Sequence, residues 1–207
     1  MHDPAIREHL GVEQRCVPNR RRTLILFNGD WRKLPHASGP SVGECESVVP
    51  VARPSMFEFA GGQEAFLTLA AAHHERCLQD PVLNHPFSHP GHPQHVERLG
   101  HYWAEVFGGP PLYSLSSDGQ SGMLTLHAGM EAQDDLGDRF VACFMKAADD
   151  AHLPDDPDFR RGIRDYMEWA VRDVHVYNPR GSAVPTGLTV PHWSWDGLEP
   201  DGALTQA

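Results

Sequence analysis

Apolar side chains recur with the period of an α-helix over residues 61–80, the first clearly patterned segment of the chain. The pattern begins at Gly61-Gly62 and stops near Asp80-Pro81, because proline does not continue a helix. It predicts a first long helix with these side chains on one face: Phe66, Leu69, Ala70 and His73.

A corner and a second helix are predicted next. Residues 84–93 contain three prolines, which forbid a continuous helix and force a tight corner that we expect to carry Phe87 inward. The helical period returns over residues 94–107, where His95, Leu99 and Tyr102 share a face, and it ends at Gly108-Gly109-Pro110-Pro111.

The rest of the patterned region predicts two more helices, over residues 134–151 and 157–176. Their apolar faces include Phe140 and Phe144 in the first and Ile163 and Met167 in the second. Before them, residues 123–127 form a short apolar segment that fits either a helical turn or a strand. Beyond Pro179 the chain is rich in Pro, Gly and Trp, and we expect its aromatic side chains to cover a groove on the helical body.

Residues 1–55 mix Arg, Pro, Gly and Ser with little periodicity, which predicts a flexible extension in which residues 23–27 could pair as a short strand. A start of translation at Met56 is therefore a hypothesis that N-terminal mass spectrometry would test. We expect one helical domain over residues 56–178, followed by an irregular tail over residues 179–207.

Composition narrows the function classes. The 207 residues carry a formal charge of −11, with one cationic cluster at residues 20–22, so nucleic acid is not an expected partner. No stretch approaches the roughly 20 apolar residues of a membrane span, so no membrane is expected as a partner. No basic start precedes an apolar block, so we expect a cytoplasmic protein without a secretory signal. The cysteines form no CxxC pair, and we expect buried or idle thiols at Cys16, Cys45, Cys77 and Cys143.

Histidine is the unusual residue type in this chain. Half of the 14 histidines lie between His73 and His101. One alternative is therefore a metal-binding module for zinc, nickel or copper, although no carboxylate or thiolate stands at a recognised ligand spacing. Its ligands would be drawn from these imidazoles: His73, His74, His85, His89, His92 and His95.

Residues 57–176 resemble truncated haemoglobins of the second group, in the order and spacing of several short motifs. These are Ala60-Gly-Gly62, Asp80-Pro-Val-Leu83, Glu97-Arg-Leu99, Tyr102-Trp103 and Gly108-Gly-Pro followed by Tyr113-Ser114. The resemblance implies an all-α, two-over-two helical sandwich. It also implies haem (iron protoporphyrin IX) as cofactor and a diatomic gas, O2, NO or CO, as ligand.

The resemblance carries several roles onto single residues. His127 takes the place of the proximal histidine that binds the haem iron, and so is the expected metal ligand. On the distal side, His74 stands where the family usually has tyrosine, and His95 stands at the distal gate. Phe140 replaces the tryptophan typical of the second group, which removes an indole N–H donor from the pocket.

Two distal imidazoles would then supply the polar groups of the ligand pocket. A neutral His95 could donate an N–H to a bound gas, or His74 could do so or hold His95 in one tautomer. His95 could also reach the iron itself in the ligand-free state. Arg98 matches a basic residue that pairs with a haem propionate, and Tyr113 could add a hydroxyl. The expected apolar lining is Phe66, Phe87, Leu99, Trp103, Met123, Leu126, Phe140 and Phe144.

The sequence leaves the reaction open. Oxygen storage or transport, gas sensing, nitric oxide dioxygenation and peroxidase-like turnover all use such a site, and a redox role would need an electron-donor reductase as partner. Two distal imidazoles could act as acid and base, so weak peroxidase activity is expected. The second alternative is a globin-shaped sensing or interaction protein that binds no haem.

Overall fold

The computed structural model describes residues 52–84, 93–132 and 135–200. Within these residues the elements are helical except for a short hairpin in the tail. They are α1 (Met56–Ala60), α2 (Gln63–Gln79), α4 (His95–Val106), the 3₁₀ turn η1 (Ser114–Ser116), α5 (Gly119–His127), α6 (Leu136–Asp150), α7 (Pro157–Val176), β1 (Trp193–Ser194) and β2 (Gly197–Leu198).

Helix α1 was not expected from the apolar pattern. Its N-terminus is a capping box, in which the Ser55 side chain accepts from the Glu58 backbone N–H and the Glu58 carboxylate accepts from the Ser55 backbone N–H. Gly61 ends the helix in the left-handed region at φ 109°, which a residue without Cβ adopts at little cost. The Ser-x-x-Glu spacing was the sequence signal for this helix.

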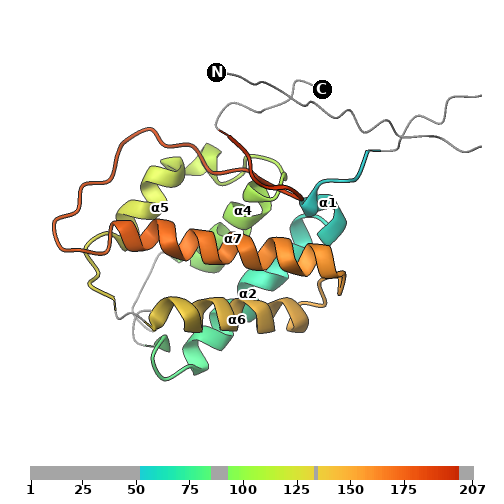
Figure 1. Cartoon of the computed structure of the whole chain (residues 1–207), viewed down its shortest axis with the longest axis horizontal. Helices are drawn as coiled ribbons and strands as arrows, with labels where there is room; N and C mark the ends of the chain where they lie inside the picture. Colours follow the sequence, from blue (N-terminus) through green and yellow to red (C-terminus); the bar gives the residue numbers. More distant parts are fainter. Residues whose placement is uncertain (1–51, 85–92, 133–134, 201–207) are drawn as a thin grey trace, which may run out of the picture. The chain divides into compact units, whose positions relative to one another are not determined.

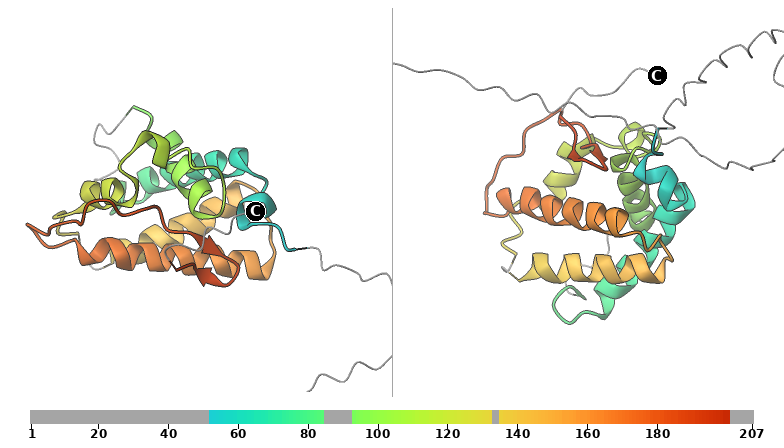
Figure 2. Two further views of the ribbon diagram at one scale, coloured as in Figure 1. Left: turned by 90° about the horizontal axis from the view of Figure 1, so that it is seen from above. Right: turned by 45° about the vertical axis from the view of Figure 1, so that its right-hand side comes forward.

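Two helical layers form the body, as the two views of Figure 2 show. Helix α2 packs against α4 in one layer, α6 lies beside α7 in the other, and α2 also contacts α6 across the layers. At Gly100 a Cβ would lie 3.1 Å from the Leu67 Cα and 3.2 Å from the Phe66 carbonyl oxygen. The close crossing of α2 and α4 therefore depends on the missing side chain at this position.

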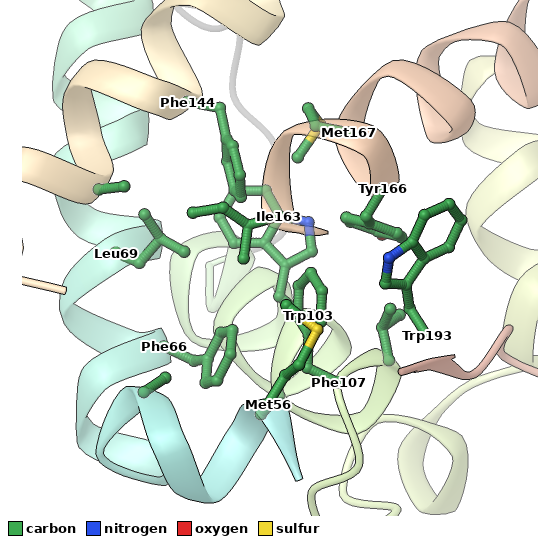
Figure 3. Packing of buried hydrophobic residues seen from close by; sticks show 14 of the residues in the cluster. Met56, Phe66, Leu69, Trp103, Phe107, Phe144, Ile163, Tyr166, Met167 and Trp193 are labelled. Carbon is green, nitrogen blue, oxygen red and sulfur yellow. The ribbon is translucent and has the colours of Figure 1, made fainter. Parts of the chain in front are cut away.

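Aromatic side chains dominate the core between the layers (Figure 3). Phe66 stacks on Phe107 with ring centroids 5.5 Å apart, and Phe107 meets Tyr166 edge-on at 4.9 Å. Trp103 and Phe144 form a similar edge-to-face pair at 5.0 Å. These fully buried rings bring α2, α4, α6 and α7 into one apolar interior.

The expected helices are confirmed with small shifts of their ends. Residues 94–107, 134–151 and 157–176 were predicted, and the structure has α4, α6 and α7 in these places. The ambiguous segment at residues 123–127 is the second half of helix α5. Residues 1–51 and 85–92, which include the expected extension and the Phe87 corner, lie outside the described residues. None of the described helices is long and apolar enough to cross a membrane.

Residues 177–200 return over the helical body after α7 (Figure 1). The tail passes α5 and ends in the β1–β2 hairpin, where Trp193 pairs with Leu198. The Trp193 ring packs on Tyr166 and Trp169 of α7, with centroids 5.8 and 6.0 Å apart. Trp195 meets Phe59 edge-on at 5.0 Å. Aromatic packing therefore fixes the end of the tail to α1 and α7.

Candidate functional site

His127 is the last residue of α5 and is partly buried. Its ring Nδ1 lies 2.8 Å from the backbone carbonyl oxygen of Met123, one helical turn earlier. A carbonyl oxygen can only accept, so Nδ1 carries the proton and donates. The neutral imidazole consequently has its lone pair on Nε2, the arrangement in which a histidine ligates a metal while its other nitrogen is held by a hydrogen bond.

The two candidate distal histidines lie together. The rings of His74 on α2 and His95 at the start of α4 have centroids 5.5 Å apart. His74 is partly buried and His95 is exposed. The crossing of α2 and α4 thus places one imidazole beside the other in the layer that these two helices form.

Three of the expected lining residues share an intermediate environment. Leu99, Met123 and Phe140 pack against the core cluster but are only partly buried. Trp103, by contrast, is 2% exposed and belongs to the core. Accessible apolar surface from α4, α5 and α6 is what a flat apolar group would cover on binding.

Arg98 and Tyr113, the expected propionate partners, are also neighbours. The Arg98 guanidinium carbon lies 5.5 Å from the centre of the Tyr113 ring, within range of a cation–π contact. Glu105, a carboxylate that is almost fully buried, accepts hydrogen bonds from the backbone N–H groups of Tyr113 and Ser114 at 3.1 and 3.0 Å. Tyr113 is therefore held in place from α4.

Three other expected lining residues differ in burial from the partly buried ones. Leu126 is 74% exposed, because its position on α5 faces away from the side that carries the buried Leu124. Phe66 and Phe144 are fully buried within the aromatic core, and so belong to the packing of the layers. Phe87 lies outside the described residues.

His73 is a buried polar residue to which sequence reasoning gave no role of its own except as a metal ligand. Its Nε2 lies 3.4 Å from the Cys77 Sγ, and its ring meets Phe140 edge-on at 4.5 Å. Burial lowers the pKa of His73 from 6.5 to about 4, so the ring is neutral at pH 7. Burial also raises the pKa of the Cys77 thiol, which suits an inert core residue.

A second feature missed from the sequence is a buried polar chain that joins three helices. The Tyr102 hydroxyl donates to Gln120 Oε1 at 2.6 Å, and Gln120 Nε2 donates to Asp173 Oδ2 at 2.9 Å. Burial raises the pKa of Tyr102 well above its ordinary value, so its hydroxyl stays protonated. This chain ties α4 to α5 and α7. Isolated polar residues on apolar faces were its only signal.

Two grooves lie elsewhere, between α6 and α7, with volumes of about 400 and 550 Å³. Val171 and Arg172 line both grooves, and no candidate site residue lines either of them. Among the described residues, no group of three or more His, Cys, Asp or Glu side chains could hold a metal ion. A cluster that uses His85, His89 or His92 would lie outside those residues.

The donor set and the surface fit a haem better than a bare metal ion. A single imidazole with Nε2 as the lone-pair atom supplies one protein ligand, which is enough for an iron already held by a porphyrin. The partly accessible apolar side chains and the Arg98–Tyr113 pair would suit the ring and its carboxylates. The residues present therefore fit a haem.

Comparisons with known proteins identify the family and the fold of the chain. The family model described as bacterial-like globin matches residues 55–173. The crystal structure of the group II truncated haemoglobin from Bacillus anthracis is 16% identical, covers 60% of this chain and 92% of its own, and has a TM-score of 0.53. At this identity the likeness shows the fold.

A haemoglobin from Chloroflexus aurantiacus is 23% identical over 59% of this chain and 98% of its own, with a TM-score of 0.49. No curated protein sequence matches the chain.

Proposed function

The chain belongs to the bacterial-like globin family, and we propose that it holds iron protoporphyrin IX through Nε2 of His127. Family membership implies a haem cofactor and a diatomic gas as ligand. Bound haem would supply an iron that takes such a ligand and exchanges electrons. The proposal goes further by assigning the protein ligand and the groups around it.

The hydrogen bond between His127 Nδ1 and the Met123 carbonyl oxygen carries the assignment, at 2.8 Å. It fixes the tautomer and the ring orientation before any metal binds, which makes Nε2 the better ligand. The bond is made within α5, so the position of the imidazole follows that of the helix. Leu99, Met123 and Phe140 would contact the ring, with Trp103 packed behind them in the core, and Arg98 with Tyr113 would meet its propionates.

His74 and His95 would provide the polar side of the gas pocket. An imidazole N–H in this place can donate to a bound diatomic ligand, and the 5.5 Å between the two ring centres allows each histidine to orient the other. His95, at the exposed end of the pair, is the first candidate donor. It is also the candidate for direct binding to the iron when no gas is present.

We also propose that the bound haem takes part in a redox reaction. One distal imidazole would take a proton from a peroxide and return it to the oxygen that leaves as water, while the haem and then a reducing substrate would supply the two electrons that the peroxide takes up. This would give weak peroxidase-like activity. Nitric oxide dioxygenation would use the same pocket together with an electron-donor reductase. We place both reactions in the cytoplasm.

The absorption spectrum of the purified protein tests the ligand assignment. Ferric, reduced and CO-bound spectra are recorded for the chain and for His127→Ala, with His175→Ala as a control at an exposed histidine of α7. We expect loss or a shift of the Soret band in His127→Ala alone. An unchanged Soret band in that variant would sink the assignment, and no band after addition of haemin would favour a haem-free globin.

The distal roles need a separate experiment. His95→Leu and His74→Leu are compared by ferrous spectra, gas dissociation rates and peroxide turnover against free haemin. A role as hydrogen-bond donor predicts faster O2 dissociation in the variant that loses the donor, on the order of tenfold for one hydrogen bond. Purely five-coordinate ferrous bands in the unaltered protein would end the idea that His95 binds the iron, and turnover no faster than haemin would refute peroxidase activity.

A further inference from the structure

Helix α5 is weakly anchored by its own residues. It has nine residues, and short isolated helices are marginal in water. Its N-cap residue, Asp118, makes no side-chain capping hydrogen bond, and the residues that α5 buries are Gln120, Ser121 and Leu124. Apolar packing of α5 therefore amounts to one fully buried leucine and the partly buried Met123, and polar contacts contribute much of what holds the helix that carries His127.

Besides the hydrogen bonds of the Gln120 side chain to Tyr102 and Asp173, these contacts come from residues 177–190, which we call the clasp. At the start of α5, the Gln120 N–H donates to the Leu188 carbonyl oxygen at 3.1 Å. The Ser121 hydroxyl donates to the Pro185 carbonyl oxygen at 2.7 Å and accepts from the Leu188 N–H at 2.9 Å. The tail thus caps helix-start groups that Asp118 does not cap.

The clasp also holds the chain just beyond the end of α5. The Gly129 N–H donates to the Tyr177 carbonyl oxygen at 2.9 Å. The Asn178 side chain makes two bonds to one residue, accepting from the Ala132 N–H at 2.7 Å and donating to its carbonyl oxygen at 3.1 Å. Both ends of the helix are therefore tied to one segment of the tail.

The clasp is anchored in turn at both of its own ends. It begins directly at the end of α7, where Tyr177 is the C-cap residue. Its last residue, Val190, is 2% exposed, and Trp193 beyond it packs on α7. Figure 1 shows the tail leaving α7, passing α5 and returning to the body. A segment fixed at both ends can transmit the position of α7 to α5.

The backbone is shaped for this contact at Gly119. Its φ is +56°, and a Cβ there would lie 2.8 Å from the Leu188 carbonyl oxygen, the atom that caps Gln120. A side chain at residue 119 would push the clasp away from the start of α5. The glycine therefore permits the capping bond from the tail.

We propose that residues 177–190 are a positioning element that sets the place of α5, and through it the place of His127 relative to the bound haem. The positioning residues are Ser121 on α5, which bonds the clasp at the start of the helix, and Asn178 in the clasp, which bonds the chain beyond its end. The restraint on α5 holds whether or not His127 binds iron. The effect on the place of His127 relative to haem rests on the proposed function.

The test uses Ser121→Ala and Asn178→Ala, singly and together, in the full chain loaded with haem. Hydrogen exchange is followed by mass spectrometry, and the iron–histidine stretching band by resonance Raman. We expect exchange over residues 119–132 on the order of tenfold faster in the double variant, with α7 unchanged. We also expect a shifted or broadened iron–histidine band and faster transfer of haem to an acceptor globin.

Controls separate positioning from general damage. Ser182→Ala removes a hydroxyl that bonds within the clasp itself, to the Pro179 carbonyl oxygen, and should leave α5 unchanged. Ser121→Thr keeps the hydroxyl and should restore much of the protection.

The two hypotheses fail separately. Unchanged exchange over residues 119–132 would overturn the clasp, whatever the spectra show. Faster exchange with an unchanged iron–histidine band would overturn its link to His127. An unchanged spectrum in His127→Ala would overturn the proposed function and that link together, while faster exchange in the clasp variants would still support the restraint on α5.

Discussion

Helices α5 and α7 are held in this globin by different forces. Helix α7 has 20 residues and buries Phe159, Ile163, Tyr166 and Met167 in the aromatic core. Helix α5 has nine residues and is held by hydrogen bonds from the tail and by the buried chain through Gln120. Apolar packing is strong and undirected, whereas hydrogen bonds fix position. The helix that carries the candidate iron ligand is the one fixed by directed contacts.

The largest loss of stability is expected from a substitution in the apolar core that holds α7. Phe159→Ala in α7 removes a fully buried ring that contacts Phe59, and should lower the free energy of unfolding by about 3–5 kcal/mol. Urea unfolding followed by circular dichroism measures this loss. Asp165→Ala, at an exposed position of the same helix, should stay within about 0.5 kcal/mol. Equal costs at the two positions would contradict the packing account of α7.

Acid should weaken the packed layers through His73. The pKa of this ring is about 4 in the folded chain and 6.5 in the unfolded one, so the unfolded state binds the additional proton between these pH values. Stability is therefore complete above pH 6.5 and falls as the pH drops toward 4, by about 3 kcal/mol in all. His73→Leu should flatten this loss in unfolding experiments at pH 7.5 and 4.5.

A substitution without a titrating group provides the control. Phe144→Leu, in the ring cluster around His73, should cost the same at both pH values. If His73→Leu keeps the full acid loss, the loss arises from other groups.

Loss of the hydrogen bonds that hold α5 should lower the free energy of unfolding by a smaller amount, and the losses should not add. Gln120→Leu removes the acceptor of the Tyr102 hydroxyl and the amide that donates to the Asp173 carboxylate, and should cost about 1–3 kcal/mol. Tyr102→Phe removes the hydroxyl at the other end of the same hydrogen bond. The double variant should therefore lose less unfolding free energy than the two single variants lose together. We expect a difference of about 0.5 kcal/mol or more, the range found for contacting pairs. Simple additivity would exclude a coupled chain.

The difference between apolar packing in α7 and directed hydrogen bonds at α5 also explains which elements the sequence could predict. The spacing of Phe66, Leu69 and Ala70 predicted α2, because the residues of one buried helix face repeat with a fixed period. Helix α5 buries Gln120 and Ser121, which break that period, and so residues 123–127 stayed ambiguous until the structure gave the helix. Contacts between residues 121 and 185, far apart in the chain, leave no periodic trace.

The candidate site also has features that the sequence could predict and features that only the structure shows. The roles of His127, His74 and His95 all came from resemblance to a family. The His127 tautomer depends on a backbone carbonyl, which no side-chain pattern reveals. The exposure of Leu126 could not be predicted either, because the apolar character of a residue does not say which side of a short helix it occupies.

Helix starts give the smallest and sharpest test of the comparison. Helix α1 is capped by its neighbour in sequence, since Ser55 Oγ accepts from the Glu58 N–H at 3.1 Å. Ser55→Ala should lower the free energy of unfolding by about 1 kcal/mol. Ser55→Asp keeps an acceptor and should recover most of that loss, as measured by urea unfolding.

Helix α5 offers no equivalent local cap, because its Gln120 N–H is satisfied by the carbonyl oxygen of Leu188 in the tail. Asp118→Ala, the matched change at its N-cap residue, should therefore cost less than Ser55→Ala, within about 0.5 kcal/mol of the unaltered chain. A cost at Asp118 equal to that at Ser55 would mean that α5 starts by its own capping, and the distinction between a locally capped and a tail-capped helix would fall.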